Sequence, residues 1–159
     1  MQRSSWIAIA AVFCILTGTP ALLYGSSSVP DDRAALKGMK QAKAIFDVRL
    51  ADLDKVLFNL ELIKETWTGI SAQKVKPQLI VTLRGPAVKL FTRDQATDEL
   101  KELLNALRQK GIRIEICSVA TRVFKVDNRQ LLPELQLVGN VLTSQIAMQN
   151  KGYALITLN

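Results

Sequence analysis

The chain has 159 residues, of which 48% are hydrophobic and 22% charged, and it contains two cysteines and no histidine. This length suits one compact domain with a short extension. The lack of histidine excludes Ser-His-Asp and Cys-His hydrolases, histidine-ligated zinc and haem, and imidazole pH switches. Two cysteines are too few for a thiolate zinc cage, an iron–sulfur cluster or a disulfide scaffold, so we expect no metal.

The net charge is +7, from 21 lysines and arginines against 14 acidic residues. The basic residues are spread from Arg33 to Lys151, and few aromatic residues accompany them. A stacking platform for nucleic acid needs both together. We therefore interpret the charge as a solvated surface and expect no nucleic-acid partner.

The first residues are typical of an export signal. Arg3 precedes a continuous apolar run over residues 6–16, and small residues lead up to Ser27, after which we expect cleavage. The alternative is an uncleaved membrane anchor over residues 6–24, close to the ~20 residues that span a bilayer. The predicted domains are a signal peptide over residues 1–27, a linker over 28–42 and a folded domain over 43–159, which is periplasmic or secreted, or else anchored on the exported side of the membrane.

The folded domain is predicted to alternate strand and helix. Asp52 is a good N-cap for a helix whose apolar residues recur at spacings of three and four, and Gly69 is expected to end it. The apolar run over residues 78–83 is typical of a central parallel strand covered on both faces. The other predicted elements, in chain order, are a strand over 43–48, a short helix over 87–91, a helix from the N-cap Thr97 to Gly111, a strand over 112–117, a helix or turn over 119–124, a short strand over 135–138, a helix over 141–150 and a strand over 153–158. This order predicts an α/β fold, a flavodoxin-like doubly wound sheet of five mainly parallel strands with helices on both faces.

Ligands of such sheets gather beyond the carboxyl ends of the strands. Cys117 lies at such an end, where a strand gives way to a helix or turn. Helix dipoles and unpaired backbone N–H groups stabilise a thiolate, so Cys117 is a candidate nucleophile. The alternative is a small buried hydrophobic residue, because free cysteine is often buried.

Four further residues are candidates for binding a ligand at the same edge. Arg84 and Gly85 form a turn that would hold an anion, the alternative being a tight turn that merely needs glycine. Arg122 would add positive charge near Cys117. Asp47 would orient a ligand, the alternative being a solvated carboxylate. No P-loop and no G-x-G-x-x-G pattern is present, so we expect neither a nucleotide nor another cofactor.

Several segments together resemble the DsrE/DsrF-like sulfur-relay family over residues 43–159. They are residues 44–48 with 55–59, residues 80–87, residues 107–117 and residues 152–157. The resemblance implies a flavodoxin-like fold assembled into trimers or hexamers. It also implies that a cysteine at the end of this strand, which Cys117 matches, carries sulfur as a persulfide. The relay members are cytoplasmic, whereas this chain carries a predicted export signal.

The leading hypothesis is an exported thiol protein in which Cys117 accepts sulfur from a donor protein and passes it to an acceptor thiol, without a cofactor. The alternative is a non-catalytic module of the same fold that binds a small ligand or assembles with itself. In that case, the alternating face that carries Arg113 and Glu115 would form a subunit interface.

Overall fold

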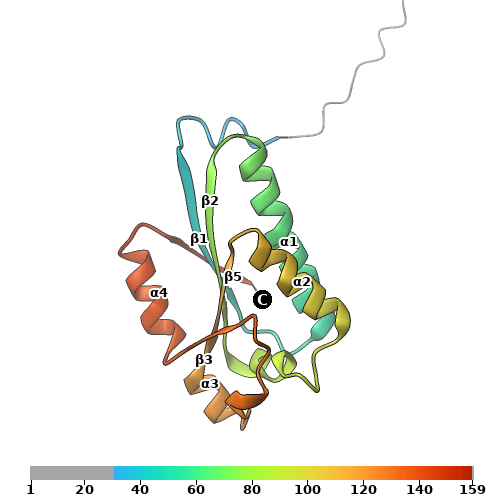
Figure 1. Cartoon of the computed structure of the whole chain (residues 1–159). Coiled ribbons are helices and arrows are strands. Elements are labelled where there is room, and N and C mark those ends of the chain that lie inside the picture. The colour runs from blue at the N-terminus through green and yellow to red at the C-terminus, as the bar shows by residue number, and fades with distance from the viewer. Residues whose placement is uncertain (1–30, 159) are drawn as a thin grey trace, which may run out of the picture. The chain divides into compact units, whose positions relative to one another are not determined.

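The computed structural model describes residues 31–158, so the predicted signal peptide over residues 1–27 lies outside the described residues. The described chain forms a five-stranded sheet in the order β4-β3-β2-β1-β5, and each pair of neighbouring strands is parallel (Figure 1). The predicted α/β fold is therefore confirmed. Among the described residues, no helix has the length and apolarity that crossing a membrane requires.

The observed elements follow the predicted order. They are β1 (Gln41–Val48), α1 (Leu53–Ala72), β2 (Lys76–Leu83), the 3-10 helix η1 (Gly85–Phe91), α2 (Asp98–Gln109), β3 (Arg113–Cys117), α3 (Ser118–Val123), the 3-10 helix η2 (Asn128–Gln130), β4 (Gln136–Val138), α4 (Val141–Gln149) and β5 (Ala154–Leu158). The first two strands begin two residues earlier than predicted, and the short helix after β2 is a 3-10 helix that starts at Gly85.

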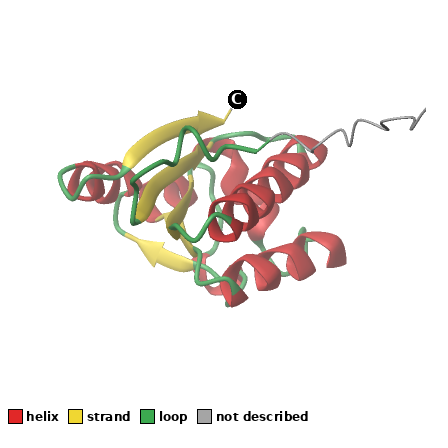
Figure 2. Cartoon of the chain, turned by 90° about the horizontal axis from the view of Figure 1, so that it is seen from above, coloured by secondary structure: helices red, strands yellow, loops and turns green. Residues whose placement is uncertain are grey.

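The helices cover the two faces of the sheet unequally. Helices α1 and α2 lie together on one face, while α4 lies on the other (Figures 1 and 2). This arrangement follows from the strand order, because right-handed crossovers from β1 to β2 and from β2 to β3 place their helices on one side. The crossover from β4 to β5 runs back across the sheet and places α4 on the opposite side.

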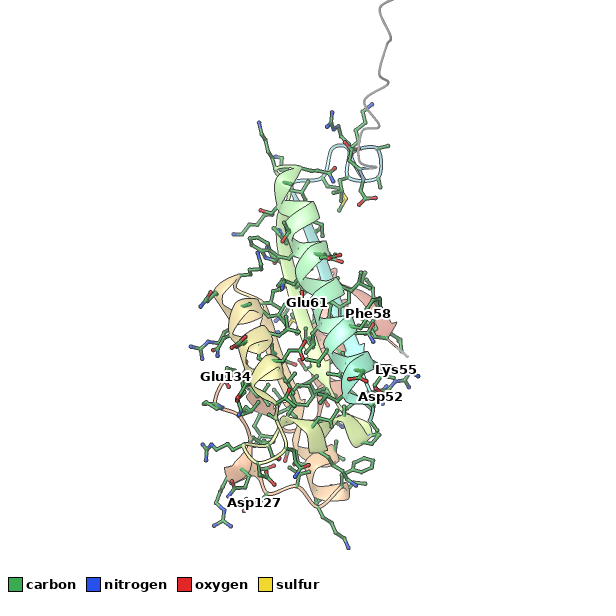
Figure 3. All side chains as sticks on the ribbon, turned by 90° about the vertical axis from the view of Figure 1, so that its right-hand side faces the viewer. Asp52, Lys55, Phe58, Glu61, Asp127 and Glu134 are labelled. Carbon is green, nitrogen blue, oxygen red and sulfur yellow. The ribbon has the colours of Figure 1, made fainter. Side chains whose placement is uncertain are left out.

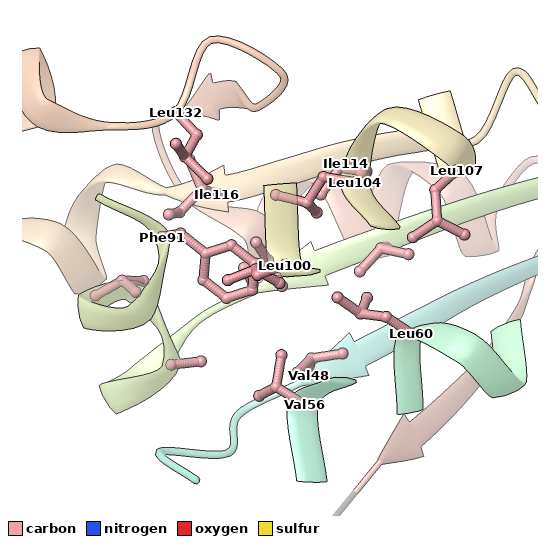
Figure 4. Close-up of a cluster of buried hydrophobic side chains, with 14 of the residues drawn as sticks. Val48, Val56, Leu60, Phe91, Leu100, Leu104, Leu107, Ile114, Ile116 and Leu132 are labelled. Carbon is pink, nitrogen blue, oxygen red and sulfur yellow. The ribbon is translucent and has the colours of Figure 1, made fainter. Parts of the chain in front are cut away.

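The main hydrophobic core lies between the sheet and the helices α1 and α2 (Figure 4). Alternate residues of the three central strands point into it, as the pleat of a strand requires. They meet the buried stripes of both helices. The strand residues are Phe46, Val48, Val81, Leu83, Ile114 and Ile116, and the helix residues are Val56, Leu60, Ile63, Leu100, Leu103, Leu104 and Leu107.

The start of α1 was predicted correctly, but its end was not. The Asp52 carboxylate accepts the backbone N–H of Lys55, as an N-cap should (Figure 3). The helix runs past Gly69 to Ala72. An exposed glycine costs a helix about 1 kcal/mol but breaks no backbone hydrogen bond, so it did not end this one. The helix ends where Lys74 takes a left-handed conformation, with φ of 61°.

Both ends of α2 were predicted correctly. The Thr97 hydroxyl accepts the backbone N–H of Leu100 at the start of the helix. Gly111, just beyond the end, has φ of +76°. These two signals fix the entry of the chain into β3.

Candidate functional site

Three candidate segments meet at the carboxyl edge of the sheet. Val48 pairs with Leu83, and Leu83 pairs with Ile116, in the register of β1, β2 and β3. The residues that follow, Arg49, Arg84 and Cys117, therefore lie at the same level of this edge. Cys117 still belongs to β3 and pairs with Val138 of β4. Neighbouring strands lie about 4.8 Å apart, so the three side chains start close together.

The turn after β2 holds Arg84 in place. The backbone N–H of Arg84 donates to the carbonyl oxygen of Val48 at 3.1 Å, and Gly85 then adopts φ of +62°. A Cβ on Gly85 would lie 3.8 Å from the carbonyl oxygen of Arg49, which is an ordinary contact. The turn therefore requires glycine for its left-handed conformation rather than for space.

Cys117 is the last residue of β3, directly before α3, and only 4% of it is exposed. It borders a pocket of about 200 Å³ that Arg84 and Gly85 also line. The other lining residues are Val119, Ala120, Val123, Phe124, Asn140 and Leu142. The pocket is thus lined by a cysteine, an arginine and an asparagine among mostly apolar residues.

A row of polar residues crosses the sheet one step before its carboxyl edge. Asp47 pairs with Thr82, Thr82 with Glu115, and Glu115 with Gln136. On the other side, Asp47 pairs with Thr157 of β5. Paired residues of neighbouring strands point to the same face. This polar row faces α4, because side chains of α4 donate hydrogen bonds to it.

Asp47 is the centre of the polar row. Its carboxylate is 2% exposed and accepts Arg84 Nε at 3.0 Å and Nη2 at 2.8 Å. It also accepts Gln145 Nε2 at 2.9 Å and the Thr82 hydroxyl at 3.3 Å, and Arg49 Nε lies 3.6 Å away. The expectation of a solvated carboxylate is wrong, because the crossover that carries α4 returns over this face and covers Asp47.

The second carboxylate of the row is also internal. Glu115 is 3% exposed, accepts the Ser144 hydroxyl of α4 at 2.6 Å and pairs with Arg113 Nε at 2.8 Å. The proposed subunit interface over Arg113 and Glu115 is therefore wrong for Glu115, because the chain's own helix covers it.

The structure separates Arg122 from the other candidates. It lies in the last turn of α3, is exposed, and does not line the pocket of Cys117. Arg84, Gly85 and Cys117 line that pocket. Asp47 does not line it but binds Arg84.

Sequence reasoning missed Gln145, Thr82 and Asn140. Gln145 is 5% exposed in a helix with almost no amphipathic pattern, so no periodicity marked it as inward-facing. Thr82 interrupts an apolar strand, a signal that was available. Asn140 caps α4 by accepting the backbone N–H of Leu142, and its position before an apolar run also pointed to that role.

Among residues 31–158, no group of three or more metal-ligating side chains is arranged to hold an ion. The arrangement brings a cysteine and an arginine whose guanidinium is held by Asp47 to one mostly apolar pocket, which supports thiol chemistry near a positive charge.

Comparison with known proteins identifies a family and a fold. A profile described as the DsrE/DsrF-like family matches residues 32–158. An uncharacterized protein from Aquifex aeolicus (strain VF5) is 23% identical over 124 residues, which is 72% of this chain. The match spans about half of that curated relative, 55% of its length.

Two solved structures are similar in fold. The protein of unknown function MTH1491 from Methanobacterium thermoautotrophicum has a TM-score of 0.64 and 20% identity, over 74% of this chain and 99% of that one. The ychN protein from E. coli has a TM-score of 0.59 and 18% identity, over 74% and 99% of the two chains. Both likenesses concern the fold alone.

Proposed function

Because the chain belongs to the DsrE/DsrF-like family, we propose that it is an exported sulfur carrier that acts through the Cys117 thiol. Family membership suggests a role related to sulfur relay, and the finer statement is our proposal. The observation that carries it is that Cys117 and Arg84 line one pocket at the carboxyl edge of the sheet.

The proposed reaction is an exchange of sulfur without net oxidation. The Cys117 thiolate attacks the outer sulfur of a donor persulfide, R–S–SH. A new sulfur–sulfur bond forms on Cys117, the donor's sulfur–sulfur bond breaks, and its electron pair leaves with R–S⁻. An acceptor thiolate then attacks the outer sulfur on Cys117 and restores the Cys117 thiolate. The reaction consumes neither a metal nor an organic cofactor.

The pocket suits a small sulfur adduct. Its volume of about 200 Å³ exceeds several times the ~30 Å³ that one water molecule occupies in the liquid. The apolar walls from Val119 and Phe124 shield the adduct from water, while Arg84 supplies a positive charge beside the sulfur that carries negative charge. The buried position of Cys117 limits access to small reagents and to partner segments that fit the pocket.

Alkylation of the native protein tests this proposal. We expect iodoacetamide to modify Cys117 in the folded protein, as peptide mapping would report, and Cys117→Ser to abolish that modified peptide. Modification of Cys117 only after denaturation would contradict the proposal, because a carrier thiol must react in the folded state.

Export remains part of the proposal and has its own test. The full-length chain, expressed in a bacterium and fractionated, should appear in the exported fraction with its N-terminus at Ser28. Retention in the cytoplasm would refute export, and retention in the membrane with an intact N-terminus would favour the uncleaved anchor.

We also propose that the chain forms a homo-oligomer, a trimer or hexamer, through β5 and α4. Edge strand β5 exposes Leu155 and Ile156, consecutive residues that point to opposite faces of the sheet. Helix α4 exposes Leu142 and Ile146, the latter to 61%. Exposed apolar patches and unpaired edge strands are features of association surfaces. This observation also favours the alternative function of an assembly module.

Light scattering coupled to size exclusion tests the oligomer. We expect the unmodified protein to run as a trimer or hexamer and Ile146→Lys to run as a monomer. Asn105→Lys, which adds the same charge at an exposed polar position of α2 on the opposite face of the sheet, serves as the matched control and should leave the assembly intact. A monomeric unmodified protein would contradict the proposal.

A further inference from the structure

The guanidinium of Arg84 has two edges with different partners. Of its five N–H donors, those on Nε and Nη2 engage Asp47, at 3.0 and 2.8 Å. Within residues 31–158, no side chain or carbonyl accepts a hydrogen bond from Nη1. Arg84 is part-buried and lines the pocket of Cys117. One edge of the guanidinium is therefore fixed by Asp47, while Nη1 has no acceptor among these residues.

Asp47 itself has no capacity left for a ligand. Its two oxygens accept hydrogen bonds from Arg84, Gln145 and Thr82, and Arg49 approaches the second oxygen. The carboxylate is buried beneath α4. Asp47 can therefore influence a ligand only through the side chains that it holds in place. Of these, Arg84 lines the pocket.

Gln145 fixes the orientation of that carboxylate. Its side-chain amide donates to Asp47 Oδ1 at 2.9 Å and to the Thr82 hydroxyl at 2.8 Å. With Oδ1 held by Gln145, Oδ2 is the oxygen that takes Arg84 Nη2. The same helix also supplies Leu142, and its N-cap Asn140, to the pocket wall. Helix α4 thus contributes to the wall of the pocket and, through Gln145 and Asp47, also holds the arginine that lines it.

We propose that Asp47 and Gln145 are positioning residues that hold the Arg84 guanidinium beside Cys117, so that the pocket selects anionic sulfur donors over neutral ones. The inference rests on the proposed reaction of Cys117. Its donor class comprises anionic polysulfides, ⁻S–Sₙ–SH, in which the outer sulfur carries the proton and the negative charge lies at the other end of the sulfur chain. When the Cys117 thiolate attacks the outer sulfur, two negative charges approach each other. The neighbouring sulfur–sulfur bond breaks, and the products are Cys117–S–SH and the shortened polysulfide ⁻S–Sₙ⁻, which carry the same total charge. A cation fixed next to both sulfurs lowers this repulsion throughout the step.

A pair of alkylating reagents of similar size measures this selectivity. Iodoacetate is an anion and iodoacetamide is neutral, and both lose iodide when the same thiolate attacks. Access to the pocket and the fraction of thiolate affect both rates equally, so they drop out of the ratio of the two rates at Cys117. It reports the electrostatic environment that an anionic reagent meets.

Substitutions of Arg84 measure how much its charge contributes to the ratio of the two rates. We expect Arg84→Gln to lower the iodoacetate-to-iodoacetamide ratio about fivefold, the effect of one charge at short range in a partly wet site. Arg84→Lys keeps the charge but cannot form the bidentate hydrogen bonds with Asp47, so the ratio of this variant should fall by about twofold. Arg108→Gln removes the same charge from an exposed position in the last turn of α2 and should leave the ratio unchanged.

Asp47→Asn separates positioning from simple charge. It removes a negative charge near the pocket, so electrostatics alone would raise the ratio, whereas loss of positioning lowers it by about threefold. Gln145→Met changes no charge and should lower the ratio in the same direction. Circular dichroism verifies that each variant is folded, and Gln145→Met provides the test if Asp47→Asn does not fold.

The outcomes distinguish the two proposals. If neither reagent modifies Cys117 in the native protein, the proposed carrier function fails. If both reagents react and Arg84→Gln leaves the ratio unchanged, the selectivity of the pocket is refuted while the thiol chemistry stands. If Arg84→Gln lowers the ratio but Asp47→Asn raises it and Gln145→Met leaves it unchanged, the positioning roles are refuted.

Discussion

Replacing Gln145 by leucine should destabilise the protein although leucine is the more hydrophobic residue. Gln145 lies on the buried side of α4 at 5% exposure, where an apolar side chain is ordinarily favoured. The sheet face below it is polar, however, since Gln145 donates to the Asp47 carboxylate and to the Thr82 hydroxyl. Leucine would leave both acceptors facing an apolar group.

The expected loss follows from these two hydrogen bonds. A bond to a charged group contributes about 1.5–3 kcal/mol and a neutral one about 0.5–1.5 kcal/mol. Burial of the leucine side chain returns roughly 1.5 kcal/mol. The net loss is about 2 kcal/mol. With a urea m-value near 2 kcal/mol per molar, the midpoint of unfolding should fall by about 1 M.

Equilibrium urea unfolding followed by circular dichroism measures this shift. Gln149→Leu is the matched control, because Gln149 lies on the same helix and is exposed. It should change stability by less than about 0.5 kcal/mol. If the Gln145→Leu protein were as stable as the unmodified one, the hydrogen bonds between the polar row and α4 would not hold this helix on the sheet, and the reasoning would be refuted.

Further predictions concern local conformation and charge. Gly69→Ala, in the exposed interior of α1, should stabilise the protein by about 0.5–1 kcal/mol, whereas Gly85→Ala, at φ of +62°, should cost about 1–2 kcal/mol in the same urea assay. Thr97→Ala removes the N-cap of α2 and should cost about 1 kcal/mol, read from its urea midpoint. The hydrogen bonds from Arg129 lower the pKa of Asp127 below its usual value of 3.8, so this pair favours the folded state above that value and loses its effect as the pH falls through the lowered pKa. An NMR titration of the Asp127 carboxyl should show the low pKa, and Arg129→Gln should raise it; an unchanged pKa would contradict the role of this pair.

The elements of the fold were predictable because their signals are local. Thr97 caps a helix and Gly111 ends it through contacts within a few residues. The apolar run of β2 reflects burial on both faces, which any central parallel strand requires. Gly69 failed as a stop signal because glycine merely weakens a helix, and the chain continued to the left-handed Lys74.

The position of the candidate site was predictable, but the hydrogen bonds between its residues were not. Parallel strands bring their carboxyl ends to one edge, so Arg84 and Cys117 were expected there from the order of the elements alone. The burial of Asp47 depends on α4, which begins almost a hundred residues later in the chain and returns over the sheet. No local pattern encodes the contact between Asp47 and Gln145, because it arises only from the register of the strands and the placement of that helix.

Intact mass spectrometry of the native protein tests the central claim most directly. The full chain, purified and treated with inorganic polysulfide, should gain the mass of one sulfur atom, which peptide mapping locates on Cys117, and lose it again on addition of an acceptor thiol. Cys117→Ser should not gain that mass at this position. A native protein whose Cys117 remains an unmodified thiol under polysulfide, while the denatured chain takes up sulfur, would contradict the account.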